Sequence, residues 1–342
     1  MFLKSLCYLS IVLLCVTALI TGCQDNGTDP SDEDAVQKTI SSLEKVSEFP
    51  FYTMTYYIDY HFDEFLETGD RPDTPSDIIF TQHGDYHACT CVSAAEGINR
   101  VFGRNQDSYG GVTVALLLFT DPPDGYASLS MVWTPCLEFD RNHLPDSTEY
   151  EENLILAPYY STEGMNEKGV AIADMSVPYA DPPYDPEKVT IYVPDLVRLV
   201  LDYAENVESA ITLISLYNIN FFDGSTDHPV HTLIADASGN SAVIEWIDGR
   251  MRVIQDDNSW QVSTNFVISG VDIPDDVTCW RYKKAYSTLQ ACDGSMDQGE
   301  TMNLMKSVSV SGTTWSCVYD LTNKTMQIAL NRDYENVYSF SL

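Results

Sequence analysis

The sequence predicts an α+β fold in which helices pack on stacked antiparallel sheets. Strand-like segments rich in β-branched and aromatic residues fill both parts of the chain that flank its centre. Two amphipathic helical segments lie between them, one opening at Pro194 and one from Val207 to Tyr217. Strands and helices do not alternate regularly, which disfavours a parallel sheet built from βαβ units.

Residues 1–23 are predicted to be a lipoprotein signal peptide. A positive start at Lys4 precedes the apolar run 11–20, which is too short to span a bilayer comfortably. The run ends in "LITGC", which resembles the lipobox of bacterial lipoproteins. That resemblance implies cleavage before Cys23, a lipid on its thiol, and export as a lipoprotein anchored in the cell envelope. An ordinary secretory signal and a retained single helix are the alternatives.

Residues 24–48 are predicted to form an acidic tether and a short helix. The stretch "QDNGTDPSDEDA" is acidic, carries Gly and Pro, and lacks an apolar period, so it is expected to be solvated. Helical spacing then predicts a helix over 34–47, from Val36, Ile40, Leu43 and Val46.

Residues 49–88 form a segment of their own before the main unit, 89–342. Residues 51–62 are aromatic and β-branched and predict a strand, and the turn-rich loop 67–77 separates it from the rest. Residues 111–119 are a continuous apolar run and predict a strand buried on both faces. Further strands are expected within 126–133 and 169–177.

The remaining elements follow the two helices. The helix from Pro194 places four apolar side chains on one face, with proline in its first turn. Three short strands form a meander over 231–255, with turns at Gly239 and Gly249. The last predicted strands lie in 314–330 and are joined by a hairpin at Thr322–Lys324.

The chain is strongly acidic. It has 51 Asp and Glu residues against 18 Lys and Arg, a formal charge of −33. A field of this sign repels nucleic acid and anionic membrane surfaces. We therefore expect no nucleic-acid partner, and contact with a membrane only through a lipid anchor.

The stretch "HACTCVSAAEGINRVFGRNQDSYG" (87–110) contains a Cys-x-Cys pair and has four explanations. His87, Cys89 and Cys91 could begin a metal site, but the only other paired histidines are His228 and His231. A disulfide is compatible with export. A buried inert pair is the third explanation, and a nucleophilic thiol is the fourth. Once the cysteines of the leader are set aside, six remain: Cys89, Cys91, Cys136, Cys279, Cys292 and Cys317.

A nucleophilic thiol needs a base, and no nearby histidine pattern supplies one. A cysteine at a chain N-terminus carries its own base, because an α-amine has a pKa of about 8. This requires cleavage between Ala88 and Cys89. It also requires a cation and a carboxylate to position the new terminus, and Arg104 and Asp107 are available.

The segment "CTCVSAAEGINRVFGRNQD" resembles the amino-terminal motif of the N-terminal-nucleophile (Ntn) cysteine amidases. That family includes choloylglycine hydrolases, penicillin V acylases, acid ceramidase, N-acylethanolamine acid amidase and penicillin acyltransferases. Its pattern is Cys-Thr-Ser or Cys-Thr-Gly, two strands joined by a turn, then Gly-Arg-Asn-x-Asp. Here the turn at Glu96–Gly97 is one residue shorter. The register makes Cys89 the nucleophile, with Cys91 as the alternative.

Five more segments resemble the family in the same order, and the resemblance covers about Phe51 to the C-terminus. They are "EGMNEKGVAIADMSVP" (163–178), "LIADASGNSAVIEW" (233–246), "QVSTNFVIS" (261–269) with "CWRYKKAY" (279–286), and "TTWSCVYD" (313–320). The resemblance implies a four-layer αββα sandwich of two stacked antiparallel sheets. It also implies hydrolysis of linear carbon–nitrogen amide bonds in a small N-acyl amide, without a metal or organic cofactor.

The resemblance also implies residue roles. Cys89 attacks the Ala88 carbonyl, and the freed amine then activates its thiol. Asn265 and the backbone N–H of Ser176 hold the oxyanion, although bile salt hydrolases have Asn near the position of Ser176.

Two arginines and a carboxylate complete the implied site. Asp107 accepts from the terminal ammonium, Arg104 lowers the pKa of the thiol, and Arg281 is a second arginine. Taken singly, Arg104 with Asp107 could be a surface ion pair, Asn265 a turn residue, and Arg281 part of a solvated helix face. The segment 49–88 is expected to remain as a small subunit, as in the acid ceramidase and acyltransferase branches.

Two other functions stay open at this point. An acyltransferase would use the same residues, and an inactive lipid-anchored binding protein would keep the fold without cleavage. The substrate is also open: bile salts, penicillin V, N-acyl homoserine lactones and N-acyl amino acids all remain. The sequence does not decide between a monomer and a homo-oligomer.

Overall fold

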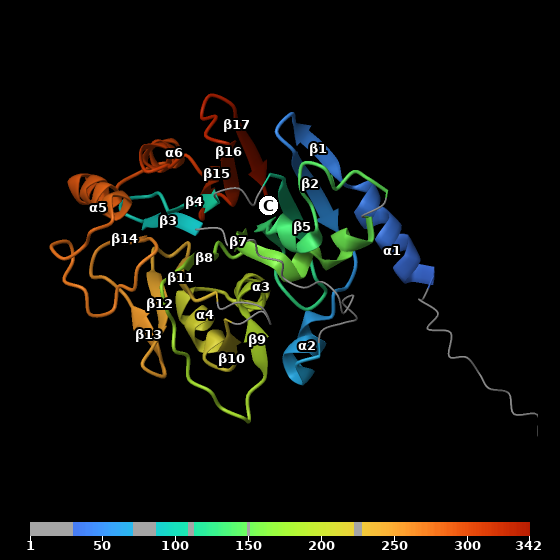
Figure 1. Cartoon of the computed structure of the whole chain (residues 1–342), viewed down its shortest axis with the longest axis horizontal. Coiled ribbons are helices and arrows are strands. Elements are labelled where there is room, and N and C mark those ends of the chain that lie inside the picture. Colours follow the sequence, from blue (N-terminus) through green and yellow to red (C-terminus); the bar gives the residue numbers. More distant parts are fainter. Residues whose placement is uncertain (1–29, 71–86, 109–112, 149–150, 222–227) are drawn as a thin grey trace, which may run out of the picture.

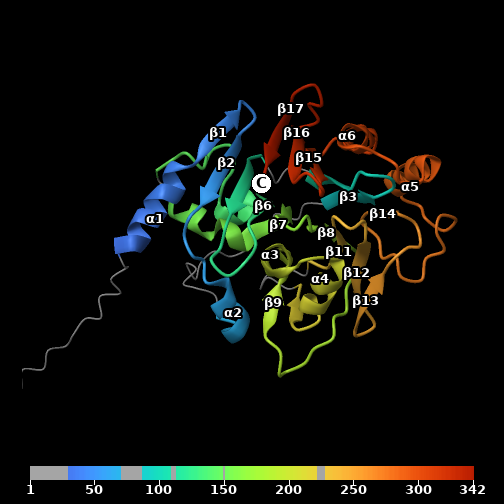
Figure 2. The same ribbon diagram turned by 180° about the vertical axis from the view of Figure 1, so that it is seen from behind.

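The computed structural model describes residues 30–70, 87–108, 113–148, 151–221 and 228–342. The predicted signal peptide and its Cys23 lie outside these residues. In the described part, two sheets stack face to face, and helices cover the outer face of each (Figures 1 and 2). The predicted αββα sandwich is thereby confirmed.

The larger sheet has nine strands in the order β1-β2-β5-β6-β7-β8-β11-β12-β13. Its strand β5 has the sequence ALLLFT and is buried at every position but one, as predicted for the apolar run that contains it. The strands are β1 (Glu44–Ser47), β2 (Phe51–Tyr56), β5 (Ala115–Thr120), β6 (Ser128–Val132), β7 (Ser161–Asn166), β8 (Ala171–Ser176), β11 (Val230–Ala235), β12 (Ser241–Ile247) and β13 (Arg250–Ile254).

The smaller sheet has six strands, all antiparallel, in the order β14-β3-β4-β15-β16-β17. They are β14 (Trp260–Ser263), β3 (His87–Ala94), β4 (Val101–Ser108), β15 (Thr313–Asp320), β16 (Thr325–Leu330) and β17 (Val337–Ser341). The predicted hairpin at Thr322–Lys324 joins β15 to β16, with Lys324 in the left-handed region at φ 58°.

Apolar side chains fill the three spaces between the four layers. Helices α3 (Val193–Tyr203) and α4 (Val207–Ile214) and the 3-10 helix η2 (Glu151–Tyr160) cover the larger sheet. Helices α5 (Trp280–Cys292) and α6 (Gln298–Ser307) cover the smaller sheet. Figure 2 shows these two helices on the side of the sheets opposite to α3 and α4.

Three short elements complete the described fold. The 3-10 helix η1 (Thr134–Leu137) follows β6, and β9 (Thr190–Tyr192) pairs in parallel with β10 (Asn218–Asn220) beside α3.

Two predictions in the N-terminal segment were wrong at their ends. The helix expected over 34–47 is α1 (Pro30–Ser41), and its expected last turn is β1, because residues 44–47 pair with β2 as the edge of the sheet. The strand expected over 51–62 ends at Tyr56, and α2 (Phe62–Thr68) follows. Phe62, Phe65 and Leu66 are buried at helical spacing, a period that the aromatic content had masked.

One pair of strands departs from the predicted antiparallel pattern. Strands β2 and β5 run parallel, from the pair Phe51 and Ala115 to the pair Tyr56 and Thr120. A parallel pair needs a long crossover connection, and here β3 and β4 of the other sheet lie between the two strands in the chain.

Smaller differences concern helix ends. The second central helix stops at Ile214 rather than Tyr217, and α5 and α6 had no predicted counterpart. The sequences of α5 and α6 are only weakly amphipathic, because polar residues occur among their buried positions. In the part of the chain that the structure describes, we find no helix with the length and apolarity needed to cross a bilayer.

Candidate active site

Cys89 lies near the start of β3 and points between the two sheets. Side chains alternate along a strand, so Cys91 shares this inward face while Thr90 points toward α5. The Cys89 side chain is 2% exposed. Its sulfur is 4.0 Å from the Oε1 atom of Gln106 on the neighbouring strand β4.

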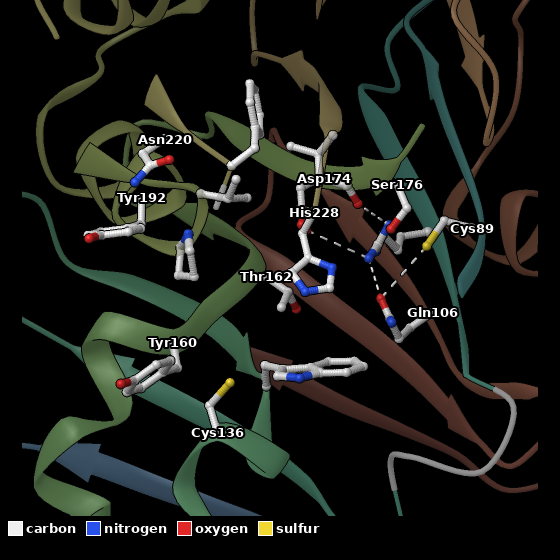
Figure 3. Close-up of a pocket in the computed structure, with 16 residues that line it drawn as sticks. Cys89, Gln106, Cys136, Tyr160, Thr162, Asp174, Ser176, Tyr192, Asn220 and His228 are labelled. Carbon is white, nitrogen blue, oxygen red and sulfur yellow. Dashed lines mark hydrogen bonds and ion pairs between the residues drawn. The ribbon is translucent and has the colours of Figure 1, made fainter. Parts of the chain in front are cut away.

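A pocket opens over Cys89 from the side of the larger sheet (Figure 3). The empty space that it encloses, together with the open solvent at its mouth, is about 780 Å³. The end at Cys89 is polar, and the opposite end combines the rings of Tyr160 and Tyr192 with the amide of Asn220 (Figure 3). The lining consists of Cys89, Arg104, Gln106, Trp133, Cys136, Tyr160, Thr162, Asp174, Ser176, Tyr192, Val193, Pro194, Asn220, Phe221, His228 and Val230.

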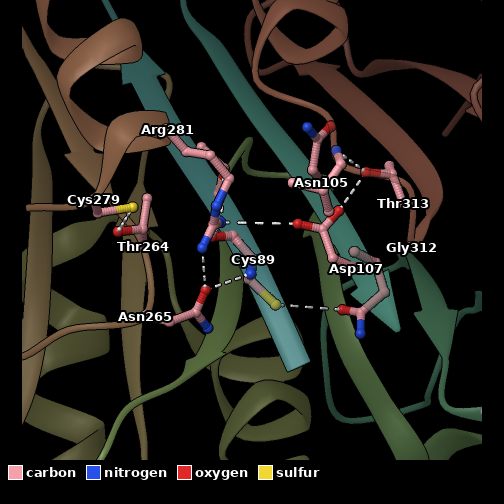
Figure 4. A network of polar contacts seen from close by, with 12 residues as sticks. Cys89, Asn105, Asp107, Thr264, Asn265, Cys279, Arg281, Gly312 and Thr313 are labelled. Atoms are coloured by element: carbon pink, nitrogen blue, oxygen red, sulfur yellow. Dashed lines mark hydrogen bonds and ion pairs between the residues drawn. The ribbon is translucent and has the colours of Figure 1, made fainter. Parts of the chain in front are cut away.

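The backbone nitrogen of Cys89 is held by Asn265, which follows β14 (Figure 4). The Cys89 N–H donates to the Oδ1 atom of Asn265 at 2.6 Å, and the Nδ2 atom of Asn265 donates to the Ser176 carbonyl at 2.9 Å. Arg281 donates to the same Oδ1 atom at 2.9 Å. These three contacts fix the orientation of the amide, and they leave one Nδ2 hydrogen for another acceptor.

Arg281 joins this arrangement to Asp107. It donates to the Cys89 carbonyl and, at 2.9 Å, to the Thr90 hydroxyl. Its Nη1 atom is 3.8 Å from the carboxylate of Asp107, which also accepts from Thr313 at 2.5 Å. Arg281 is 7% exposed, so it is not part of a solvated helix face.

Arg104 lies on β4 and faces the pocket side, 1% exposed. Its Nε atom forms an ion pair with Glu163, and its Nη2 atom donates to Gln106. Its Nη1 atom donates to the Asp174 carbonyl at 2.5 Å, and the Asp174 carboxylate is 3.9 Å from Nη2. Each of its three nitrogens is therefore engaged.

Burial sets the electrostatics of the site. It raises the pKa of the Cys89 thiol, and Arg104 opposes this shift without reversing it. The expectation that Arg104 lowers the thiol pKa therefore holds for its own contribution but not for the net shift in the intact chain. Burial also raises the pKa of Asp107 and of Asp174 to about 6, against the lowering effect of the neighbouring arginines.

A buried histidine–carboxylate pair holds the loop that carries Asn265. His231 on β11 is 3.0 Å from Glu245 on β12 and 2.6 Å from the Thr264 carbonyl. Glu245 also accepts from the backbone N–H groups of Ile268 at 2.6 Å and Ser269 at 2.9 Å. The loop is thus fixed on both sides of Asn265.

The alternatives for the cysteine pair can now be compared with the structure. The residues that it describes contain no cluster of three or more His, Cys, Asp or Glu side chains that could hold a metal. His231 is committed to Glu245 and to Thr264. All six cysteines of the main unit are free thiols. Cys91 is 3.8 Å from Arg104 but does not line the pocket.

The structure brings together the predicted residues Cys89, Asp107, Asn265, Arg281 and Ser176 in one network, with Arg104 on the adjoining pocket wall. Sequence reasoning missed Gln106, Glu163 and Asp174. Gln106 is the variable position of Gly-Arg-Asn-x-Asp, and strand alternation already placed it on the same face as Arg104. Glu163 is the first residue of the segment 163–178 that resembles the family, but nothing in the sequence indicated that it pairs with Arg104.

The comparisons with known proteins bear on this arrangement. Residues 152–266 match the family model "Linear amide C-N hydrolases, choloylglycine hydrolase family". The matched segment contains Glu163, Ser176 and Asn265, and it excludes Cys89 and Arg281. A search of curated proteins found no match.

Solved structures with the same fold include two variants of the conjugated bile acid hydrolase from Clostridium perfringens. One has a TM-score of 0.52 and 16% identity, and the other has 0.51 and 15%; each comparison covers 74% of this chain and 92% of the other. The penicillin V acylase from Agrobacterium tumefaciens also matches, with a TM-score of 0.49, 18% identity, and coverage of 74% and 86%. The family match and the shared fold confirm the resemblance of this chain to the linear amide C–N hydrolases of the choloylglycine hydrolase family.

Proposed function

We propose that this protein is a self-processing amidase that cleaves linear N-acyl amides with Cys89 as its N-terminal nucleophile. The observation that carries the proposal is the position of Cys89. Its sulfur faces an open pocket, while its own backbone nitrogen is held by Asn265. A cysteine that used only a side-chain base would not need its nitrogen in the site.

The first step is cleavage of the chain. The Cys89 sulfur attacks the Ala88 carbonyl carbon, the bond to the Cys89 nitrogen breaks, and that nitrogen takes the proton. Water then hydrolyses the thioester, which leaves a carboxylate on Ala88 and a free amine and thiol on Cys89. Asp107 is proposed to compensate the charge of the new ammonium, and it is linked to Cys89 through Arg281, which donates to the Cys89 carbonyl and lies 3.8 Å from the Asp107 carboxylate.

Turnover then uses the freed amine. It accepts the thiol proton, and the thiolate attacks the substrate carbonyl. The remaining Nδ2 hydrogen of Asn265, together with the backbone N–H of Ser176, is proposed to stabilise the oxyanion. The loss of one such donor typically costs about 100-fold to 1000-fold in rate. The ammonium returns its proton to the leaving nitrogen, and water releases the acyl group as an acid.

The segment 49–88 is proposed to remain bound after cleavage. Its strand β2 pairs with β5 along six residues, and Phe51, Tyr52 and Met54 are at most 1% exposed. Each such side chain contributes about 1.5–3 kcal/mol by burial. The Tyr60 hydroxyl adds a bond to the buried carboxylate of Asp202 at 2.8 Å.

Attachment to the cell envelope through a lipid on Cys23 is also proposed, and its support is the lipobox in the sequence. Labelling of the chain with an alkyne fatty acid tests it. Incorporation that is lost in Cys23→Ser is expected, and equal incorporation in both chains would contradict the assignment.

The experiment that tests the main proposal is the intact mass of the purified chain and its variants. We expect two fragments divided between Ala88 and Cys89 in the wild type and in Cys91→Ser, which is the matched control. Cys89→Ala should remain whole. A wild-type chain that stays whole, with Cys89 alkylated no faster than Cys91, would refute self-processing and favour a binding protein.

A further inference from the structure

We propose that the pocket selects N-acyl amides without a negative charge over those that carry a carboxylate or sulfonate. The inference rests on the proposed function, because it names the substrate class of the same site. It is carried by the way in which each positive group of the described lining is already occupied.

Arg104 is the only arginine of the described lining, and no lysine occurs there. An anionic substrate would need this guanidinium as its partner. However, Arg104 is tied to Glu163, Gln106 and Asp174, and all three of its nitrogens are used. A bound anion would have to compete with Gln106 and Asp174 for the Nη donors and would add a third negative group around a guanidinium that Glu163 and Asp174 already face.

The N-terminus of α3 is the second place where an anion could bind. Tyr192, Val193 and Pro194 bring this helix end to the pocket wall, and helix N-termini attract anions. Here the protein supplies its own anion. The Asp195 carboxylate accepts from the Tyr192 N–H at 2.8 Å, and Pro194 has no N–H to offer.

Negative charge is instead built into the site. Asp174 lines the pocket and faces Arg104 together with Glu163, so two carboxylates surround one guanidinium. The whole chain adds a field of −33 formal charges. Such a field lowers the local concentration of anions and slows their association.

The far end of the pocket favours uncharged groups. Trp133, Tyr160 and Phe221 provide aromatic surface, and Val193 and Val230 provide aliphatic surface. An aromatic or alkyl acyl chain fits this wall, which leaves the amine part near the polar end.

A matched pair of amides tests the inference. The 4-phenylbutanoyl amides of glycinamide and of glycine share the same scissile bond and almost the same shape, but only the second is an anion at pH 8. We expect kcat/KM to be at least about tenfold higher for the glycinamide at low salt, and the ratio to shrink as salt screens the field. Equal kcat/KM values, or a higher value for the negatively charged N-(4-phenylbutanoyl)glycine, would overturn the inference.

Two variants locate the source of the selectivity. Asp174→Asn should reduce the ratio several-fold, because one carboxylate beside Arg104 is lost. Asp248→Asn removes the same unit of charge at an exposed position outside the pocket lining and should leave the ratio within about twofold. An equal response of both variants would contradict a role for the pocket and leave the long-range field as the only source.

Binding separates failure of this inference from failure of the proposed function. Calorimetric titration of Cys89→Ala with each amide needs no turnover. If neither amide is hydrolysed but the glycinamide binds more tightly, the selectivity stands and the proposed chemistry fails. If both are hydrolysed without preference, the chemistry stands and the selectivity fails. Absence of binding by either amide refutes the selectivity.

Discussion

Glu245 is the most informative position to change, because it acts on the reaction only through Asn265. Its side chain is 1% exposed and does not line the pocket. It accepts from His231 and from the backbone N–H groups of Ile268 and Ser269. Glu245→Gln keeps the shape of the side chain and replaces one oxygen by an NH₂ group.

The cost follows from the number of donors that Glu245 receives. Hydrogen bonds to a charged group contribute about 1.5–3 kcal/mol each. The new NH₂ group of the Glu245→Gln side chain takes the place of an oxygen that accepted at least one of these three hydrogen bonds. At least one hydrogen bond is therefore lost, and the NH₂ group faces another N–H donor in its place. We expect the free energy of unfolding to fall by about 2–4 kcal/mol.

The effect on catalysis should appear in kcat. Asn265 lies three residues before Ile268, so release of the loop moves its Nδ2 donor away from the oxyanion. Removal of the donor itself sets the upper limit, about 100-fold to 1000-fold. We expect Glu245→Gln to lower kcat by about 10-fold to 100-fold with KM nearly unchanged, because residues 264–269 do not line the pocket.

The assay is steady-state hydrolysis of an uncharged N-acyl amide, together with urea unfolding. Leu154→Ala on η2 is the matched control, because a buried leucine typically loses 2–5 kcal/mol and Leu154 lies in the core cluster between η2 and the larger sheet, which includes no residue of the loop 264–269. If Glu245→Gln loses stability but keeps the kcat of Leu154→Ala, other contacts hold Asn265 and the positioning argument is wrong.

Three further changes test other parts of the structure. Asp107 has a folded pKa of about 6 against an ordinary 3.8, so the stability it confers is complete below pH 3.8 and is lost as pH rises to 6. The difference in unfolding free energy between wild type and Asp107→Asn should therefore fall by about 2 kcal/mol between pH 4 and 7 in urea titrations. Glu163→Gln leaves the buried Arg104 charge without its carboxylate and should cost about 3–5 kcal/mol by the same measurement. Tyr60→Phe removes the bond to Asp202 and should let the N-terminal fragment of the split chain dissociate at a lower urea concentration, followed by size-exclusion chromatography.

Each of these predictions has an outcome that contradicts it. A pH-independent difference for Asp107→Asn would mean that its carboxyl titrates normally in the folded chain. A loss below about 1 kcal/mol for Glu163→Gln would mean that Asp174 suffices as the counter-charge of Arg104. Fragments that separate at the same urea concentration with Tyr60→Phe would place their cohesion in the β2–β5 pair alone.

The sequence predicted much of the site because its residues are close to one another on two strands. Cys89, Arg104 and Asp107 lie on β3 and β4, whose register follows from alternation and one turn. Asn265 and Arg281 were reached only through the family resemblance. Their contact with Cys89 depends on how β14 and α5 pack, which no local pattern encodes.

What could not be predicted depends on burial and on distant partners. The pairing of Glu163 with Arg104 joins two different sheets, so no sequence spacing indicates it. The pKa of Cys89 also required the structure. Arg104 alone suggests a lowered value, but the desolvation of the thiol is larger.

The position of the proposed cut explains how the chain can be divided without losing its core. Strand β2 lies in the nine-stranded sheet, whereas the Ala88–Cys89 bond lies near the start of β3 in the six-stranded sheet. Its loss breaks only the backbone continuity at the start of β3, since Cys89 onward keeps its pairing with β4 and β14. Phe51 packs in the same inter-sheet layer as Cys89, so both products would share one apolar core. The contacts that hold Cys89 in place therefore do not depend on the Ala88–Cys89 peptide bond that is cleaved to activate it.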